Sequence, residues 1–183
     1  AGSSILPKRP ATLLRNVLTK ETEDVSISFD GRNTDIRTSG FEMTSRLSEG
    51  RYPNYGAVIP KDNPNCITVN REAVIAALRR VLIFSSAVSS LVKIRLDRGR
   101  MTVSSQDTDF SMSAEEAILC DYNGAPMSIG FKGPFLLDLI NNLGGDEIVI
   151  KLADASRAGV IIPAEQPEGE EVLMLLMPMM LGD

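Results

Sequence analysis

Histidine is absent from this chain of 183 residues. Without it the chain cannot form a Ser-His-Asp triad or a Cys-His pair, and it lacks the side chain that most often serves as general base and metal ligand. Tryptophan is also absent, and aromatic residues make up only 5% of the sequence. The core must therefore consist mainly of Leu, Ile, Val and the eight methionines.

Cysteine is scarce as well. The two cysteines, Cys66 and Cys120, lie far apart, and no Cys-x-x-Cys spacing occurs. This argues against a zinc site or a redox dithiol. Two isolated thiols fit a reducing cytoplasm, although a single disulfide between them stays open. We therefore expect a cytoplasmic protein that needs no metal or other cofactor.

Long apolar runs are missing. The most apolar stretch, Leu173–Leu181, is too short to span a bilayer and contains Pro178. No signal peptide is visible, and the chain begins Ala-Gly-Ser-Ser without an initiator Met, which looks like a processed, tagged or cropped end. We expect no membrane among the partners of this protein.

Basic residues do not outnumber acidic ones. The formal net charge is −5, which argues weakly against nucleic acid as a partner, because phosphate binding usually appears as a basic excess. The distribution is uneven, however, since Lys8 and Arg9, Arg79 and Arg80, and Lys132 fall at the three helix-like segments of the chain. From the residues alone, a solvated helix face is the simpler interpretation of these charges.

A repeat organises the chain. A short apolar stretch, a helix-like stretch and alternating strands recur three times, at a spacing of roughly sixty residues. Apolar residues on one helical face predict helices over about 10–18, 71–82 and 134–143. The expected strands lie near residues 25–29, 35–38, 41–47, 67–69, 92–96, 101–103, 127–131, 148–152, 160–162 and 172–180.

Local signals mark the ends of these elements. Asn70 is suited to cap the second helix with Glu72 in its first turn, and Gly144 and Gly145 are suited to end the third. Each unit is thus a strand, a helix and further antiparallel strands, which predicts an α+β fold. Alternation over residues 25–29 predicts a half-buried strand there.

The number of units bears on domain organisation. One helix on a few strands buries little, so the units should pair, and an odd count suggests that half of a preceding domain has been cut away. The segment 49–56, with Pro60 and Pro64, is rich in Gly and Pro and is the predicted connector. We expect a truncated half-domain in 1–62 and a complete domain in 63–183.

Four short motifs occur along the chain in order. They are the connector Gly50-Arg51-Tyr52-Pro53-Asn54-Tyr55 with Ile59-Pro60, the strand Ser128-Ile129-Gly130-Phe131, the helix start Leu136-Leu137-Asp138, and the tail Met177-Pro178-Met179-Met180-Leu181. In this order they resemble the bacterial DNA sliding clamps, the beta subunit of the replicative DNA polymerase. The resemblance covers essentially the whole chain. The chain departs from the family's usual pattern at Met180, where a basic residue is common.

The resemblance implies a DNA clamp fold with two of these units per domain and three domains per subunit. It implies a processivity factor without catalytic activity, a homodimeric ring that encircles double-stranded DNA without sequence specificity. Its implied partners are the polymerase alpha subunit, the clamp loader and other proteins with a clamp-binding motif, and its implied place is the cytoplasm, on the nucleoid. The alternative is a DNA-acting enzyme such as a metal-dependent nuclease, which the absence of histidine and of a carboxylate constellation disfavours.

The tail around Pro178 is the most informative segment. Leu173 and Leu175 fit a buried strand, but a proline cannot continue a central strand, so the residues after it should be partly exposed. Methionine suits surfaces that accept several partners. The resemblance implies a groove for partner peptides, whose other wall would come from residues upstream of this chain. Its lining would include Pro53, Val58, Phe135, Leu176, Met177, Pro178, Met179 and Leu181.

The resemblance also assigns the basic residues. The repeat helices of a clamp line its central hole, so the basic residues at these helices are expected to face DNA and to contact phosphate without reading bases. They are Lys8, Arg9, Arg79, Arg80 and Lys132.

Ile83 and Phe84 follow the second helix, and Ile83 lies off its core stripe. From the residues alone, the pair could tuck under the loop that begins at Ser85. The resemblance implies instead a head-to-tail contact with the first domain of a neighbouring subunit. Such an interface joins two different patches, so we expect this chain, which carries one of them, not to close a ring by itself.

Acidic residues also occur in pairs and could in principle hold a metal ion. No pair matches a nuclease or polymerase pattern, so we interpret all of them as solvated surface. The pairs are Asp107/Asp109, Glu115/Glu116 and Asp146/Glu147.

Overall fold

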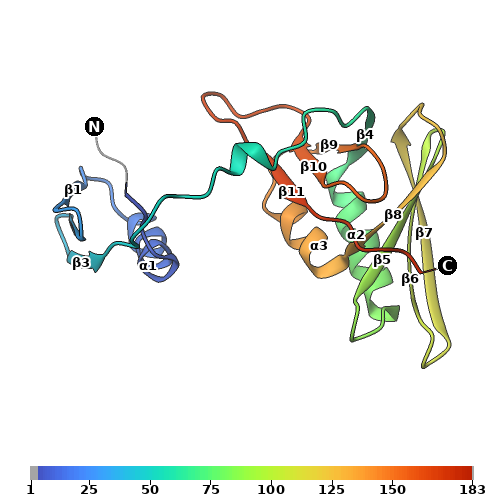
Figure 1. Ribbon diagram of the computed structural model, residues 1–183, viewed down its shortest axis with the longest axis horizontal. Coiled ribbons are helices and arrows are strands. Elements are labelled where there is room, and N and C mark those ends of the chain that lie inside the picture. The colour runs from blue at the N-terminus through green and yellow to red at the C-terminus, as the bar shows by residue number, and fades with distance from the viewer. Residues whose placement is uncertain (1–3, 183) are drawn as a thin grey trace. The chain divides into compact units, whose positions relative to one another are not determined.

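A computed structural model describes residues 4–182 and divides the chain into two compact units. The N-terminal unit ends at Tyr55 and the C-terminal unit begins at Gly56. Both units contain helices and antiparallel strands, which confirms the predicted α+β class (Figure 1).

The N-terminal unit consists of one helix and a three-stranded sheet. Helix α1 spans Lys8–Leu18, and the strands β1 (Ser26–Phe29), β2 (Asn33–Arg37) and β3 (Glu42–Arg46) pair in the order β1-β2-β3. The turn between β1 and β2 is held by Asp30, whose carboxylate accepts the backbone N–H groups of Arg32 and Asn33. The predicted helix and all three predicted strands are therefore present.

Burial in the N-terminal unit differs from the prediction. Leu14, Ile36 and Leu47 are buried, but every residue of β1 is exposed, including Ile27 and Phe29. Alternation along a strand identifies its apolar face, but it cannot establish that another element covers that face. The prediction of a half-buried strand at 25–29 is therefore wrong.

The C-terminal unit runs twice through the same order of elements. After the 3-10 helix η1 (Tyr55–Ala57), the first half contains β4 (Asn65–Asn70), α2 (Arg71–Val81), η2 (Leu82–Phe84), β5 (Leu91–Asp97), β6 (Arg100–Asp107) and β7 (Met112–Asp121). The second half contains β8 (Met127–Lys132), α3 (Gly133–Asn141), β9 (Glu147–Leu152), β10 (Gly159–Pro163) and β11 (Met174–Leu176). The repeated order of strand, helix and strands confirms the periodicity of the sequence.

The two halves exchange their first strands. The eight strands are ordered β11-β10-β9-β4-β7-β6-β5-β8, so β4 pairs with β9 of the second half and β8 pairs with β5 of the first. The register sets Ile67 opposite Ile150 and Ile94 opposite Ile129. Because each half contributes a strand to the other, neither half can unfold without exposing the sheet of its neighbour.

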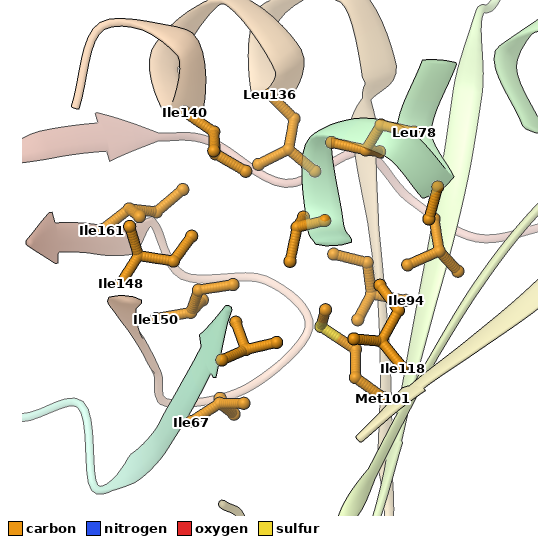
Figure 2. Close-up of a cluster of buried hydrophobic side chains, with 14 of the residues drawn as sticks. Ile67, Leu78, Ile94, Met101, Ile118, Leu136, Ile140, Ile148, Ile150 and Ile161 are labelled. Atoms are coloured by element: carbon orange, nitrogen blue, oxygen red, sulfur yellow. The ribbon is translucent and has the colours of Figure 1, made fainter. Parts of the chain in front are cut away.

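The core of the C-terminal unit lies between the helices and the strands. Figure 2 shows Leu78 of α2 and Leu136 and Ile140 of α3 directed towards the isoleucines of the strands. Met101 also reaches this cluster and is fully buried. Burial of one such side chain contributes about 1.5–3 kcal/mol. As expected from the lack of aromatic residues, the cluster is almost entirely aliphatic.

The starts of the two helices are built differently. Asn70 caps α2 as predicted, because its side-chain oxygen accepts the N–H of Ala73 at 2.9 Å. At the start of α3, a methyl group on Gly133 would overlap the side chain of Leu82 and lie 2.7 Å from that of Val92. Glycine is therefore required where α3 passes closest to the first half.

The last strand is shorter than predicted. β11 ends at Leu176, whereas alternation suggested a strand through residue 180. Beyond Pro178 the backbone makes one further contact, in which the Met179 N–H donates to the Gly130 oxygen of β8 at 2.8 Å. Proline supplies no N–H for a sheet, so the ladder breaks around it.

Candidate functional site

The tail after β11 forms a partly exposed apolar surface together with the start of α3. Met174 and Leu176 pack against the core, whereas Met177 is 61% exposed and Phe135 57% exposed. Figure 1 shows the dark red tail leaving β11 beside α3 and continuing towards β5 and β8. We name this the tail surface and define it by Phe135, Leu176, Met177, Pro178, Met179 and Leu181.

The crossing of the tail over β8 depends on Gly130. A methyl group at this position would lie 2.8 Å from Leu181 Cδ2 and 2.9 Å from the Met179 oxygen. Such distances are shorter than van der Waals contact, so any side chain here would push the tail away. The strand motif and the tail motif, distant in the sequence, therefore meet in the structure.

Two other residues expected in the groove lie elsewhere along the chain. Val58 follows η1 in the C-terminal unit and is 63% exposed. Pro53 is exposed and belongs to the N-terminal unit. The residues that the described structure brings together are those of the tail surface.

The predicted DNA-facing residues differ in their surroundings. Lys8 and Arg9 begin α1 and are exposed. Arg79 and Arg80 lie exposed in the last turn of α2, and the Arg79 guanidinium donates to the Asn141 side chain of α3 at 3.5 Å. Lys132 is the last residue of β8 and is half-buried.

Arg80 is engaged by a carboxylate. Its Nε and Nη2 donate to the two oxygens of Glu116 on β7, at 2.5 and 2.7 Å. This paired hydrogen bond lowers the pKa of Glu116 and raises the pKa of Arg80. The charge of Arg80 is thus balanced within the protein, a feature that no pattern in the sequence indicated.

Lys132 connects two of the predicted sites. Its ammonium lies 5.4 Å from the centre of the Phe135 ring, at the distance of a cation–π contact. A residue expected to face DNA therefore contacts a residue of the tail surface.

The predicted interface residues lie in η2. Ile83 is 73% exposed and Phe84 is 36% exposed, so Ile83 does not tuck under the following loop. Phe110 and Met112, in and just after the turn between β6 and β7, are exposed as well, and η2 lies against both strands. In the sequence, the only indication of this exposed pair was that the apolar Phe110 lies within a polar turn.

The acidic pairs and the cysteines form no recognisable centre. Asp107 is buried, and its carboxylate accepts the N–H groups of Asp109 and Phe110 in the β6–β7 turn. In residues 4–182, no group of three or more Asp, Glu, Cys or His side chains could hold a metal ion. Both thiols are free, and burial raises the pKa of Cys120.

No helix in the described part of the chain has the length and apolar character that crossing a membrane requires.

Comparison with known proteins gives a consistent result. Residues 56–180 match the family described as DNA polymerase III beta subunit, C-terminal domain. Beta sliding clamps of Caulobacter vibrioides and Pseudomonas aeruginosa are 27% and 25% identical, over 94% and 93% of this chain. The chain spans about half the length of these curated relatives, 46% in each case.

Solved structures agree with the sequence match. A sliding clamp of Bartonella birtlesii bound to griselimycin superposes with a TM-score of 0.91 at 30% identity, over 98% of this chain and 48% of that one. A sliding clamp of Pseudomonas aeruginosa with a ligand gives 0.90 at 25% identity, over 97% and 48%. The chain therefore belongs to the family of the DNA polymerase III beta subunit, the bacterial sliding clamps, and its residues 56–180 correspond to the C-terminal domain of that family.

Proposed function

We propose that this protein acts as a DNA polymerase processivity factor, a ring that encircles duplex DNA and tethers other proteins to it. The observation that carries the proposal is the clamp fold of the C-terminal unit, which ends in a partly exposed Met-Pro-Met tail beside α3. The proposed role is non-catalytic and needs no cofactor. We expect the protein to act in the bacterial cytoplasm, on the nucleoid.

The proposed domain boundaries follow from the elements. Residues 63–183 would be the C-terminal clamp domain, because its first strand, β4, begins at Asn65. Residues 1–62 would be the second half of a middle domain together with the connector. The order of helix and three antiparallel strands in α1 to β3 supports this, since α2 and α3 are each followed by three strands.

The proposed DNA contacts are electrostatic. Three of these basic residues are exposed on helices, namely Lys8, Arg9 and Arg79. Their side chains can reach DNA phosphates while the protein slides along the duplex. Arg80 can contribute only if it leaves Glu116. Contacts of this type are independent of base sequence, as a sliding ring requires.

The proposed docking site for partner proteins is the tail surface, with Val58 as a further lining residue. The polymerase alpha subunit, the clamp loader and repair proteins would bind through short apolar segments. Exposed methionine and phenylalanine favour such binding, because they combine large contact area with adaptable shape.

Ring assembly would use Ile83 and Phe84. Both are exposed at the end of α2, and the neighbouring Phe110 and Met112 enlarge the apolar area. We propose a head-to-tail contact between this patch and a different patch on a second subunit.

The docking proposal is tested by replacing Met179 with Lys. A charge at a central anchor should weaken binding of short Leu- and Phe-rich peptides by about 2 kcal/mol or more, roughly thirty-fold, in a fluorescence anisotropy titration. The backbone bond from Met179 to Gly130 remains available in this variant, so the tail keeps its path. Leu119→Lys, at an exposed leucine of β7 outside the tail surface, is the control and should bind normally. Equal affinity of the Met179 variant and the parent protein would refute the docking site.

A further inference from the structure

The segment before α1 is held in the same way as the strands before α2 and α3. In each of the three repeats, the residue three positions before the helix bridges the end of the third strand of its own repeat or the segment just after it. The bridged pairs are Ile5–Ser48, Thr68–Asp121 and Gly130–Met179. Because the same position makes the same contact each time, residues 4–7 correspond to the ends of β4 and β8.

The strands β4 and β8 each have a second edge, which pairs with the other half of the C-terminal unit. β4 pairs with β9, and β8 pairs with β5. In both ladders, the residue two positions before the helix lies opposite the second residue of the first strand after the other helix. The opposed pairs are Val69–Ile148 and Phe131–Val92, and all four side chains are buried. Each half therefore completes the core of the other.

The N-terminal unit carries the same two edges. The Ile5 oxygen accepts the N–H of Ser48 at 2.9 Å, and successive residues of an extended backbone direct their polar groups to opposite edges, so Leu6 directs its own away from Ser48. β1 pairs only with β2 among the residues that the structure describes (Figure 1). Its second and fourth residues, Ile27 and Phe29, are 52% and 56% exposed. An apolar strand edge of this kind readily accepts another strand.

A second copy of the chain carries both of the edges that the first copy needs. We propose that two copies form a two-fold symmetric dimer through their N-terminal units, in which residues 4–7 of each copy pair with β1 of the other. The register of β4 and β8, transferred to this pair, sets Leu6 opposite Ile27 and Ser4 opposite Phe29. The contact is isologous, so two identical ladders form together. It is distinct from the head-to-tail contact proposed for ring assembly.

The charges at the ends of these ladders are complementary. In the C-terminal unit, the first residue of each helix donates its backbone N–H, at 2.8 Å, to the residue that precedes the paired strand. The bonded pairs are Arg71–Asp146 and Gly133–Ser90. The same contact in the dimer joins Lys8 to Val25 of the second copy. The exposed basic residues Lys8 and Arg9 then lie next to the exposed acidic pair Glu23 and Asp24. Opposite charges at this point favour the proposed register over a slipped one.

Sedimentation velocity of the full chain without DNA, over a concentration series, tests the dimer. The parent protein should form dimers that dissociate on dilution, whereas Ile27→Lys should stay monomeric because it places a charge in each ladder. Its circular dichroism should not change, since Ile27 is exposed in the single copy. Ile83→Lys, at an exposed isoleucine of the C-terminal unit, is the matched control and should dimerise. Dimers that depend on Ile83 and not on Ile27 would overturn the proposal. So would a parent protein that is monomeric throughout, which would leave this face to another occupant, such as a preceding repeat of a longer chain.

A charge exchange tests the register. Reversal of both Lys8 and Arg9 to Glu should weaken the dimer by about ten-fold or more, because like charges then face each other. Changing Glu23 and Asp24 to Lys in the same chain should restore the affinity. Reversal of Arg98 and Arg100 alters the net charge equally, lies outside the ladders and should leave the dimer intact. If the exchanged charges failed to restore the dimer, the proposed pairing would be wrong.

Discussion

Arg80 stands in the last turn of α2, and two of its nitrogens donate to Glu116 on β7. The neighbouring Arg79 faces the Asn141 side chain and no carboxylate among the described residues. Two adjacent arginines, equivalent in the sequence, therefore have different capacities to bind phosphate. At the scale of single residues, the neighbour across the fold decides what a charge can do.

The Arg80–Glu116 pair makes stability depend on pH in a defined direction. The pKa of Glu116 is lowered in the folded protein, so the pair stabilises the fold above the ordinary glutamate pKa of about 4.3. This stabilisation is lost as the pH falls through the lower, folded value. Urea unfolding of the parent protein and of Glu116→Gln should differ at pH 7, and the difference should shrink in acid. Glu115→Gln, on the same strand, is the control. If the stability difference between the parent protein and Glu116→Gln stayed the same at low pH, Glu116 would stabilise the fold by a means other than its charge.

At the scale of elements, the start of α2 depends on a side chain and the start of α3 depends on close packing. Asn70 provides an oxygen to the first turn of α2, whereas Lys132, at the corresponding position before α3, makes no capping hydrogen bond through its side chain. Gly133 instead allows α3 to approach Leu82 and Val92. The same element is thus fixed by different means in the two halves of the repeat.

Removal of the Asn70 cap should weaken the first half. Asn70→Ala leaves the N–H of Ala73 without its partner, and the loss of such a cap costs about 1 kcal/mol. Chemical unfolding followed by circular dichroism measures this change in the free energy of unfolding. Asn70→Asp keeps an acceptor at the cap and should retain most of the stability. If Ala and Asp proved equally destabilising, the hydrogen bond to Ala73 would not be the source of the effect.

At the scale of the whole molecule, the charge of the chain opposes its proposed partner, because the net charge is −5 and DNA is an anion. Binding must therefore depend on local groups of basic residues, and Lys8 and Arg9 are the clearest, as they are exposed together at the start of α1. The net negative charge of the chain cannot replace these local contacts, because it repels DNA at long range.

Charge reversal at Lys8 and Arg9 should therefore weaken DNA binding and flatten its salt dependence. The slope of log affinity against log salt concentration should fall by about 0.9 for each DNA phosphate that the variant no longer neutralises. Binding of duplex DNA over a salt series measures this slope. Reversal of both Arg98 and Arg100, two exposed arginines at the β5–β6 turn, changes the net charge by the same amount and is the control for net charge alone. Identical slopes for the Lys8/Arg9 variant and the parent protein would mean that these residues only face solvent.

The sequence by itself was sufficient to predict the order of helices and strands in this protein. Apolar spacing predicted the three helices within a few residues, and the repeat predicted that residues 63–183 run twice through the same order of elements. These features are local, since a helix or strand is indicated by the spacing of residues close in the chain. The cap at Asn70 was predicted for the same reason, because it depends on the backbone chemistry of a few neighbouring residues, whereas the last strand, predicted over 172–180, ends at Leu176.

Only the tertiary structure decided which side chains share a surface. Arg80 and Glu116 are thirty-six residues apart, and the tail meets Gly130 through contacts between segments nearly fifty residues apart in the sequence. Local patterns carry no information on such pairs, because their proximity depends on how strands from the two halves are ordered in the sheet. The exposure of β1 was likewise undetermined by its alternation, since burial requires an element that covers the face. The sequence therefore specified the repeated units, and packing between units determined which charges are neutralised and which stay available to a partner.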